Sequence, residues 1–195
     1  MKNFLKSDWF KCLSCLIILA IVLCSTLAVL NDLLFVSPDE RTQRALTKIY
    51  GQEVDFTTTL DVDNGDTAKT NQFGKIEKIY QVDTDLVFKS VGLNGYKGGT
   101  ITLWIKVINS DNKFIVDKVI LESYEKQTLM SKFNQPYFNN FLINVTDAYN
   151  SGNYIFSPVS DANGLKNPMT GATKSATAAT NAVNCVIEYL LGGNA

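Results

Sequence analysis

The sequence predicts an α+β protein with an N-terminal transmembrane helix, one antiparallel-sheet domain and a C-terminal helix. Three observations carry this prediction. Residues 12–30 form an apolar run without a charged side chain. Residues 100–108 alternate apolar and polar side chains with the period of a strand. Residues 174–191 place apolar side chains such as Ala176 and Val183 at helical spacing.

Composition limits what the protein can do. At 195 residues the chain has room for a membrane anchor, expected over residues 1–36, and one domain over residues 37–195. The net charge of −1 predicts no nucleic-acid binding. The absence of histidine excludes a Ser-His-Asp arrangement and removes the commonest metal ligand. We therefore expect no catalytic residue and no metal site, and any redox chemistry must come from a cofactor.

The apolar run of 19 residues is long enough to span a bilayer. Three basic residues precede it: Lys2, Lys6 and Lys11. Three acidic residues follow it: Asp32, Asp39 and Glu40. The positive-inside rule then predicts a single-pass protein of the cell membrane, with a cytoplasmic N-terminus and an extracytoplasmic domain. A signal peptide cleaved near Ala28 is the alternative.

The first part of the domain is expected to contain one helix and a hairpin. Ser37 and the following proline predict a helix start, and the helix should run to about Tyr50 as a spacer, with Gly51 ending it. A threonine-rich strand is expected over residues 54–62, followed by a turn at residues 63–66. Two further strands, 76–82 and 86–91, should form a hairpin.

A second antiparallel pair is expected from residues 100–108 and 114–122. We predict that the first of these strands is half-buried and that the second turns Ile115, Val119 and Leu121 to one face. A short helix should follow over residues 135–141. Cys185, in the last helix, is expected to be a small buried hydrophobe.

The stretch Thr170-Gly171-Ala172-Thr173 stands at the head of the last predicted helix. A helix start offers backbone N–H groups and positive dipole charge, and both stabilise an anion such as phosphate. Gly171 and Ala172 leave room for a ligand, while the hydroxyls of Thr170, Thr173 and Ser175 can bond phosphate oxygens. The same hydroxyls can equally cap the helix, with no ligand involved.

This stretch resembles the Ser/Thr-Gly-Ala-Thr motif of the FMN-binding domain family. That family includes the G subunit of the Rnf electron-transport complex and the C subunit of the sodium-pumping NADH:quinone reductase. The resemblance implies that Thr173 carries FMN covalently, through a phosphoester bond. It also implies that a separate flavin transferase, which uses FAD, makes this bond.

A second segment carries the resemblance. Gly95, Tyr96 and Gly98 match the family's Gly-Tyr-x-Gly opening, and the strand after residue 114 leads to a corner that keeps the family's Glu as Glu125. The resemblance implies that the flavin ring lies near this corner, close to Glu125, Thr128 and Leu129, with Tyr96 beside it. The alternative is that the glycines are turn residues and that Tyr96 packs on the sheet.

The function implied by the resemblance is electron relay, by a membrane-anchored FMN subunit of an Rnf-type complex. Its partners would be the other membrane subunits and the flavin transferase. One alternative is a pilin-like surface-assembly protein, which has the same architecture of anchor and sheet. Another is a degenerate flavin domain without cofactor, because Asn167 stands where the family usually has Asp and the corner lacks the family's Pro and Gly.

Overall fold

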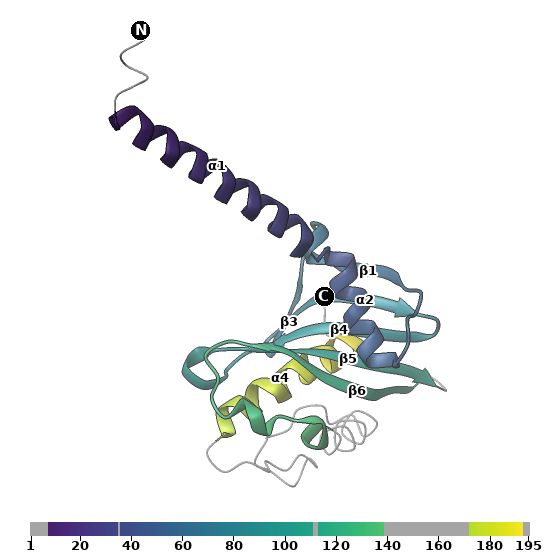
Figure 1. Ribbon diagram of the computed structural model, residues 1–195. Coiled ribbons are helices and arrows are strands. Elements are labelled where there is room, and N and C mark those ends of the chain that lie inside the picture. Colours follow the sequence, from purple (N-terminus) through teal and green to yellow (C-terminus); the bar gives the residue numbers. More distant parts are fainter. Residues whose placement is uncertain (1–7, 35, 111–112, 139–171, 193–195) are drawn as a thin grey trace. The chain divides into compact units, whose positions relative to one another are not determined.

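The computed structural model describes residues 8–34, 36–110, 113–138 and 172–192 (Figure 1). The chain divides into two compact units, residues 1–42 and 43–195. The helices are α1 (Asp8–Leu34), α2 (Pro38–Tyr50) and α4 (Thr173–Leu190). The strands are β1 (Thr57–Asp61), β2 (Lys69–Thr70), β3 (Gly74–Val82), β4 (Asp85–Gly92), β5 (Ile101–Ser110) and β6 (Lys113–Tyr124). The expected α+β architecture of N-terminal helix, antiparallel sheet and C-terminal helix is confirmed.

Helix α1 contains the expected apolar run. Its segment Lys11–Leu33 comprises 23 residues with a mean hydropathy of 2.8. The hydroxyls of Ser25 and Thr26 donate to the carbonyls of Ile21 and Val22, each at 2.7 Å, so these polar groups are satisfied within the helix. By length and composition, this helix is able to cross a membrane.

Helix α2 begins and ends where its sequence predicts. The Ser37 hydroxyl accepts the Glu40 N–H at 3.1 Å, and Gly51 ends the helix with a φ of 79°. The expectation that this helix is only a spacer is wrong. Ala45, Leu46 and Ile49 are buried against the sheet, because their spacing gives α2 an apolar stripe.

The sheet is antiparallel, with the strand order β1-β3-β4-β5-β6 and the short β2 beside β3. The two predicted hairpins are present, since β3 pairs with β4 and β5 pairs with β6. The first strand begins later than expected, at Thr57. Residues 62–64, where a turn was expected, form a single 3-10 turn ending at Gly65.

Both faces of the sheet are covered (Figure 1). Neighbouring residues on one strand point to opposite faces. Ile79, Phe88 and Leu103 pack with α4, whereas Tyr80 and Trp104 pack with the buried residues of α2. Two hydrophobic cores therefore lie on either side of a single sheet.

The prediction that β5 is half-buried is wrong for this reason. Residues 101–105 are all buried, including the alternate Thr102 and Trp104. The indole Nε1 of Trp104 donates to Glu122 at 2.9 Å, so its polar atom is satisfied. The period of two is present in the sequence, but the packing of α2 on the second face is not visible there.

Strand β6 also departs from its expected pattern. Val119 and Leu121 pair with Ile105 and Leu103 as expected. Ile115 does not join them, because the register shifts at Asp117 and brings Val116 into the core instead. This β-bulge offsets the simple alternation by one residue.

The chain after β6 enters the core again through three aromatic residues. Phe133, Tyr137 and Phe138 are buried, and their rings meet edge to face with centroids 4.9 and 5.2 Å apart. Residues 135–138 are helical, in agreement with the predicted short helix. The rest of that predicted helix lies outside the described residues.

Candidate functional site

Helix α4 lies directly on β4. A Cβ placed on Gly92 would collide with the backbone of Ala178 and Ala182, so only glycine permits this approach. Ser90 Oγ donates to the Ala182 carbonyl at 2.8 Å, and Asn181 Nδ2 donates to the Leu93 carbonyl at 2.8 Å. These contacts fix where the N-terminal end of α4 lies.

The described part of that helix end carries no acidic side chain. Helix α4 begins at Thr173, and its N-cap residue Ala172 makes no side-chain capping bond. Its first turn has no acidic residue and carries Lys174, although the helix dipole favours negative charge there. The side chain of Thr173 is exposed to solvent. Thr170 and Gly171 lie outside the described residues.

Helix α2 provides an internal comparison. Its N-terminus has a capping serine, Ser37, and two acidic residues in the first turn, Asp39 and Glu40. Such groups satisfy first-turn N–H groups and complement the dipole. By contrast, α4 has no side-chain cap from Ala172 and no acidic residue in its first turn.

The Gly-Tyr-x-Gly segment forms a tight loop between β4 and β5. The Gly95 N–H donates to the Gly99 carbonyl at 2.9 Å, and the residues between them form the short 3-10 turn η2 (Tyr96–Gly98). Lys97 and Gly98 both have left-handed backbone conformations. Tyr96 is 38% exposed, and the Lys97 ammonium lies 5.5 Å from the centre of its ring.

The corner after β6 lies against this loop. The Glu125 N–H donates to the Thr100 carbonyl at 3.0 Å. Two non-glycine residues of the corner, Lys126 and Leu129, adopt left-handed conformations with φ of 56° and 60°. Backbone strain of this kind concentrates at functional sites. The side chains of Glu125, Thr128 and Leu129 are all exposed.

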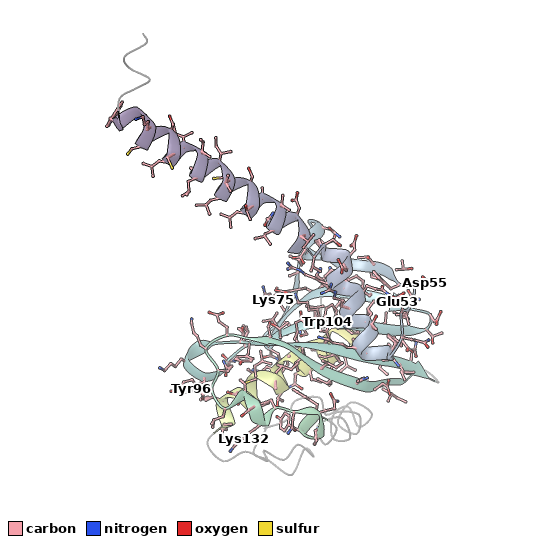
Figure 2. The ribbon with its side chains drawn as sticks, viewed as in Figure 1. Glu53, Asp55, Lys75, Tyr96, Trp104 and Lys132 are labelled. Atoms are coloured by element: carbon pink, nitrogen blue, oxygen red, sulfur yellow. The ribbon has the colours of Figure 1, made fainter. Side chains whose placement is uncertain are left out.

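Gln127 joins the loop, the corner and the helix. Its Oε1 accepts the Tyr96 N–H at 3.0 Å and the Ser175 hydroxyl at 2.8 Å. Its Nε2 donates to the Glu125 carbonyl at 2.8 Å. Figure 2 marks Tyr96 on this loop, at the end of the sheet where α4 begins. The structure thus brings together all three segments that contain the predicted site residues.

Sequence reasoning missed Gln127 itself. No periodicity in the sequence marks Gln127. The resemblance to the flavin family matches Glu125 in this corner but not Gln127. The one available signal was a polar residue in place of the family's proline. Ser175 was expected to bond a phosphate or to cap the helix. In the structure its side chain is buried, and its hydroxyl donates to Gln127.

Exposed lysines flank the residues of the Gln127 network in the sequence. Three exposed lysines each lie next in sequence to a residue of the Gln127 network: Lys97, Lys126 and Lys174. Lys126 lies 3.4 Å from Glu125, the acidic residue of the corner. An anionic ligand would meet favourable charge here.

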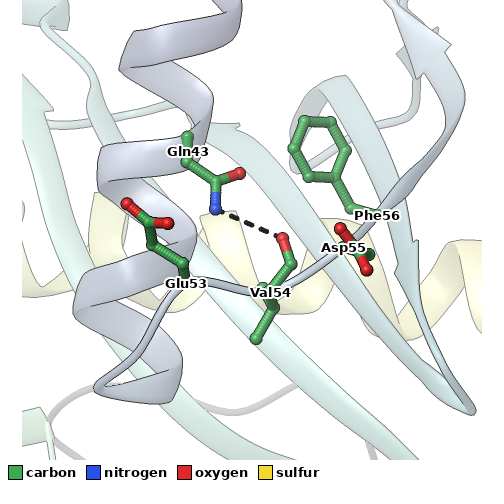
Figure 3. Close-up of a pocket in the computed structure, with 5 residues that line it drawn as sticks. All are labelled: Gln43, Glu53, Val54, Asp55 and Phe56. Carbon is green, nitrogen blue, oxygen red and sulfur yellow. Dashed lines mark hydrogen bonds between the residues drawn. The ribbon is translucent and has the colours of Figure 1, made fainter.

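Two other features of the described residues combine charged or polar side chains. A shallow pocket of about 410 Å³ is lined by Gln43, Glu53, Val54, Asp55 and Phe56 (Figure 3). Its two carboxylates are exposed, and its one described hydrogen bond, from Gln43 to the Val54 carbonyl at 3.2 Å, is internal. Among the described residues, no group of three or more potential metal ligands occurs.

The second feature is a buried ion pair beside β1. Lys78 Nζ lies 3.0 Å from Asp61 and 2.8 Å from Asp63, and the Tyr80 hydroxyl donates to Asp61 at 3.0 Å. Burial lowers the pKa of Lys78, but hydrogen bonds to Asp63 and Asp61 outweigh that effect and raise it. Because the Lys78 ammonium lies between the two carboxylates, we interpret this cluster as a stabilising ion pair and not as a ligand site.

Comparison with protein-family models, curated proteins and solved structures finds no match for this chain. The fold defines the class: an α+β domain that follows one helix able to span a membrane.

Proposed function

We propose that this protein is a membrane-anchored flavoprotein subunit that carries FMN on Thr173 and relays electrons in an Rnf-type ion-translocating complex. The observation that carries the proposal is the Gln127 network. The two segments that resemble the flavin family are far apart in sequence, yet Gln127 bonds Tyr96 of one and Ser175, just after the other. Chance resemblance in two loops would not require them to meet.

The N-terminus of α4 supports a phosphate at this position. By helix geometry, the N–H groups of Lys174 and Ser175 have no acceptor within the helix. The described end of the helix has neither a side-chain cap from Ala172 nor an acidic residue in the first turn. A phosphoester on Thr173 would place negative charge where the dipole stabilises it.

The residues present fit the group in two further ways. The Thr173 side chain is exposed, so a transferase can reach its hydroxyl. Exposed Leu129 and Tyr96 offer apolar surface for the ring. When bound, FMN would supply the one- and two-electron chemistry that the side chains of this chain lack. The chain itself would hold the phosphate, orient the ring and supply the basic surroundings.

The membrane placement is part of the proposal. The basic residues before the apolar run 12–30 and the acidic residues after it favour a cytoplasmic N-terminus. The domain would then work outside the cytoplasm, where a covalent bond prevents loss of the flavin. Its partners would be other membrane subunits and the flavin transferase that uses FAD.

The test is the intact mass of the full chain after co-expression with a flavin transferase. We expect a gain equal to FMN less one water, located on Thr173 by peptide mapping. Thr173→Ala should abolish the gain. Thr177→Ala is the matched control, because this hydroxyl lies one turn further along α4 and donates to the Thr173 carbonyl at 3.0 Å.

Two results would count against the proposal. An unmodified mass, with the transferase active on a known acceptor, would favour the degenerate flavin domain or the surface-assembly protein. Flavin that remains attached to Thr173→Ala after denaturation would exclude Thr173 as the acceptor.

A further inference from the structure

We infer that Gln127 is a positioning residue of this site, whose carboxamide holds the first turn of α4, and with it the Thr173 hydroxyl, in register with the corner. The inference rests on the proposed function, because the group that is positioned is the flavin acceptor. It adds a residue that neither the motif nor the resemblance identifies.

The orientation of the carboxamide is determined by its neighbours. The Tyr96 N–H can only donate, so the atom 3.0 Å from it must be the oxygen, Oε1. The Glu125 carbonyl can only accept, so the atom 2.8 Å from it must be Nε2. With Oε1 as the acceptor, the Ser175 hydroxyl donates its proton to Gln127 at 2.8 Å.

The loop is built closely around this side chain. A Cβ on Gly95 or on Gly99 would collide with the Gln127 amide. A Cβ on Gly99 would also collide with the Glu125 carbonyl. The two glycines therefore give Gln127 the space to reach from the corner to the helix.

The link to the acceptor is short. Ser175 lies two residues after Thr173 within the first turn of α4 and is 2% exposed. A rigid helical turn transmits the position of one residue to the other. Without the Gln127 bond, the buried Ser175 hydroxyl would have no partner among the described hydrogen bonds, and the turn would shift or fray to hydrate it.

The neutrality of Gln127 matters as well. Glutamate has nearly the same shape and keeps the acceptor for Tyr96 and Ser175, but it cannot donate to the Glu125 carbonyl. It would also bring a negative charge next to the proposed phosphate and ring. Gln127→Glu therefore separates the electrostatic contribution of this residue from its steric one.

The experiment compares full-length Gln127→Met, Gln127→Glu and the native protein. The first readout is the initial rate at which the transferase attaches FMN to Thr173. Because a small misplacement of a reacting group can cost about a hundredfold in rate, we expect both variants to be slower by about tenfold to a hundredfold. Gln81→Met is the matched control, since Gln81 is exposed and bonds only the nearby Asp83 carbonyl among the described contacts.

The second readout is the midpoint potential of the attached flavin, which a purely structural role would leave unchanged. We expect Gln127→Glu to lower the potential, because its charge disfavours the anionic reduced flavin, and Gln127→Met to change it less. If a Gln127 variant does not fold, Ser175→Ala breaks the same bond from the helix side and should reproduce the slower attachment.

The outcomes separate the two proposals. If the native protein accepts no FMN, the proposed function fails, and this inference falls with it. If the native protein is modified and the folded Gln127 and Ser175 variants match it in rate and potential, only the positioning role of Gln127 is overturned.

Discussion

Gly92 of β4 and Ala182 of α4 meet backbone to backbone: a Cβ on Gly92 would come within 3.0 Å of the Ala182 Cα. This contact seats the C-terminal helix on the sheet and so determines where its N-terminus lies. The first prediction tests it. Gly92→Ala should lower the free energy of unfolding by about 1–3 kcal/mol, the usual cost of overpacking, in urea denaturation.

Gly51→Ala is the comparison for that prediction. Nothing lies within 4 Å of a Cβ on Gly51, but its φ of 79° is left-handed. We expect a loss of about 1 kcal/mol, from backbone strain alone. If both variants lost the same small amount of unfolding free energy, close packing at Gly92 would not explain the loss in Gly92→Ala.

The second prediction concerns Lys174, which lies at the positive end of the α4 dipole. Lys174→Glu should stabilise the flavin-free protein by about 0.3–1 kcal/mol, because a negative side chain complements the first turn. The same change should slow FMN attachment, since it repels the phosphate. Thermal unfolding and the attachment rate measure the two effects, with Lys174→Gln separating loss of the positive charge from gain of a negative one. Faster attachment in Lys174→Glu would contradict an anion site here.

The third prediction concerns the buried pair of Lys78 and Asp61. Lys78→Met should destabilise the protein by about 3–5 kcal/mol at neutral pH, because it leaves a buried carboxylate without its cation. The raised pKa of Lys78 means that the folded state binds this proton more tightly than the unfolded chain does. The stabilisation that charged Lys78 gives the folded state is thus complete below the unfolded pKa of about 10.4. It is lost as the pH rises through the higher pKa of the folded state.

Urea denaturation of native and Lys78→Met protein at several pH values measures that dependence. The difference in unfolding free energy should stay constant from about pH 6 to pH 9 and shrink only in more alkaline solution. A difference that shrank steadily between pH 7 and pH 9 would mean that another group titrates in its place.

The fourth prediction uses Cys185 as a reporter of helix opening. Cys185 is fully buried, and burial raises the pKa of its thiol to about 11. The thiol is therefore neutral and shielded at pH 8, and maleimide should label it only after unfolding. Peptide mapping distinguishes it from the cysteines of α1. Rapid labelling of Cys185 in the folded protein would show that α4 opens readily from the sheet.

How far the sequence predicts this molecule depends on the range of the interactions. Helix α4 and both hairpins follow from local periodicity and were predicted within a few residues. Val116 replaced Ile115 in the core because a bulge depends on the partner strand, which periodicity does not contain. Burial of both faces of β5 required α2, a helix distant in sequence.

The candidate site divides in the same way. Thr173 could be proposed from small residues at a predicted helix start, which is a local signal. Gln127 could not, because its role depends on contacts with Ser175, 48 residues away, and Tyr96, 31 residues away. A single polar residue in a corner has no pattern of its own until the chain is folded.

The irregular register of β6 has a consequence for solubility. Among the described strands β6 pairs only with β5, so its outer backbone groups form an edge that another chain could extend. The two register shifts of β6 fall at Asp117 and Glu122, whose carboxylates bind Lys106 and Trp104 of β5. Each shift interrupts the regular ladder of that strand. A second copy would therefore meet an irregular border, which discourages aggregation by strand addition.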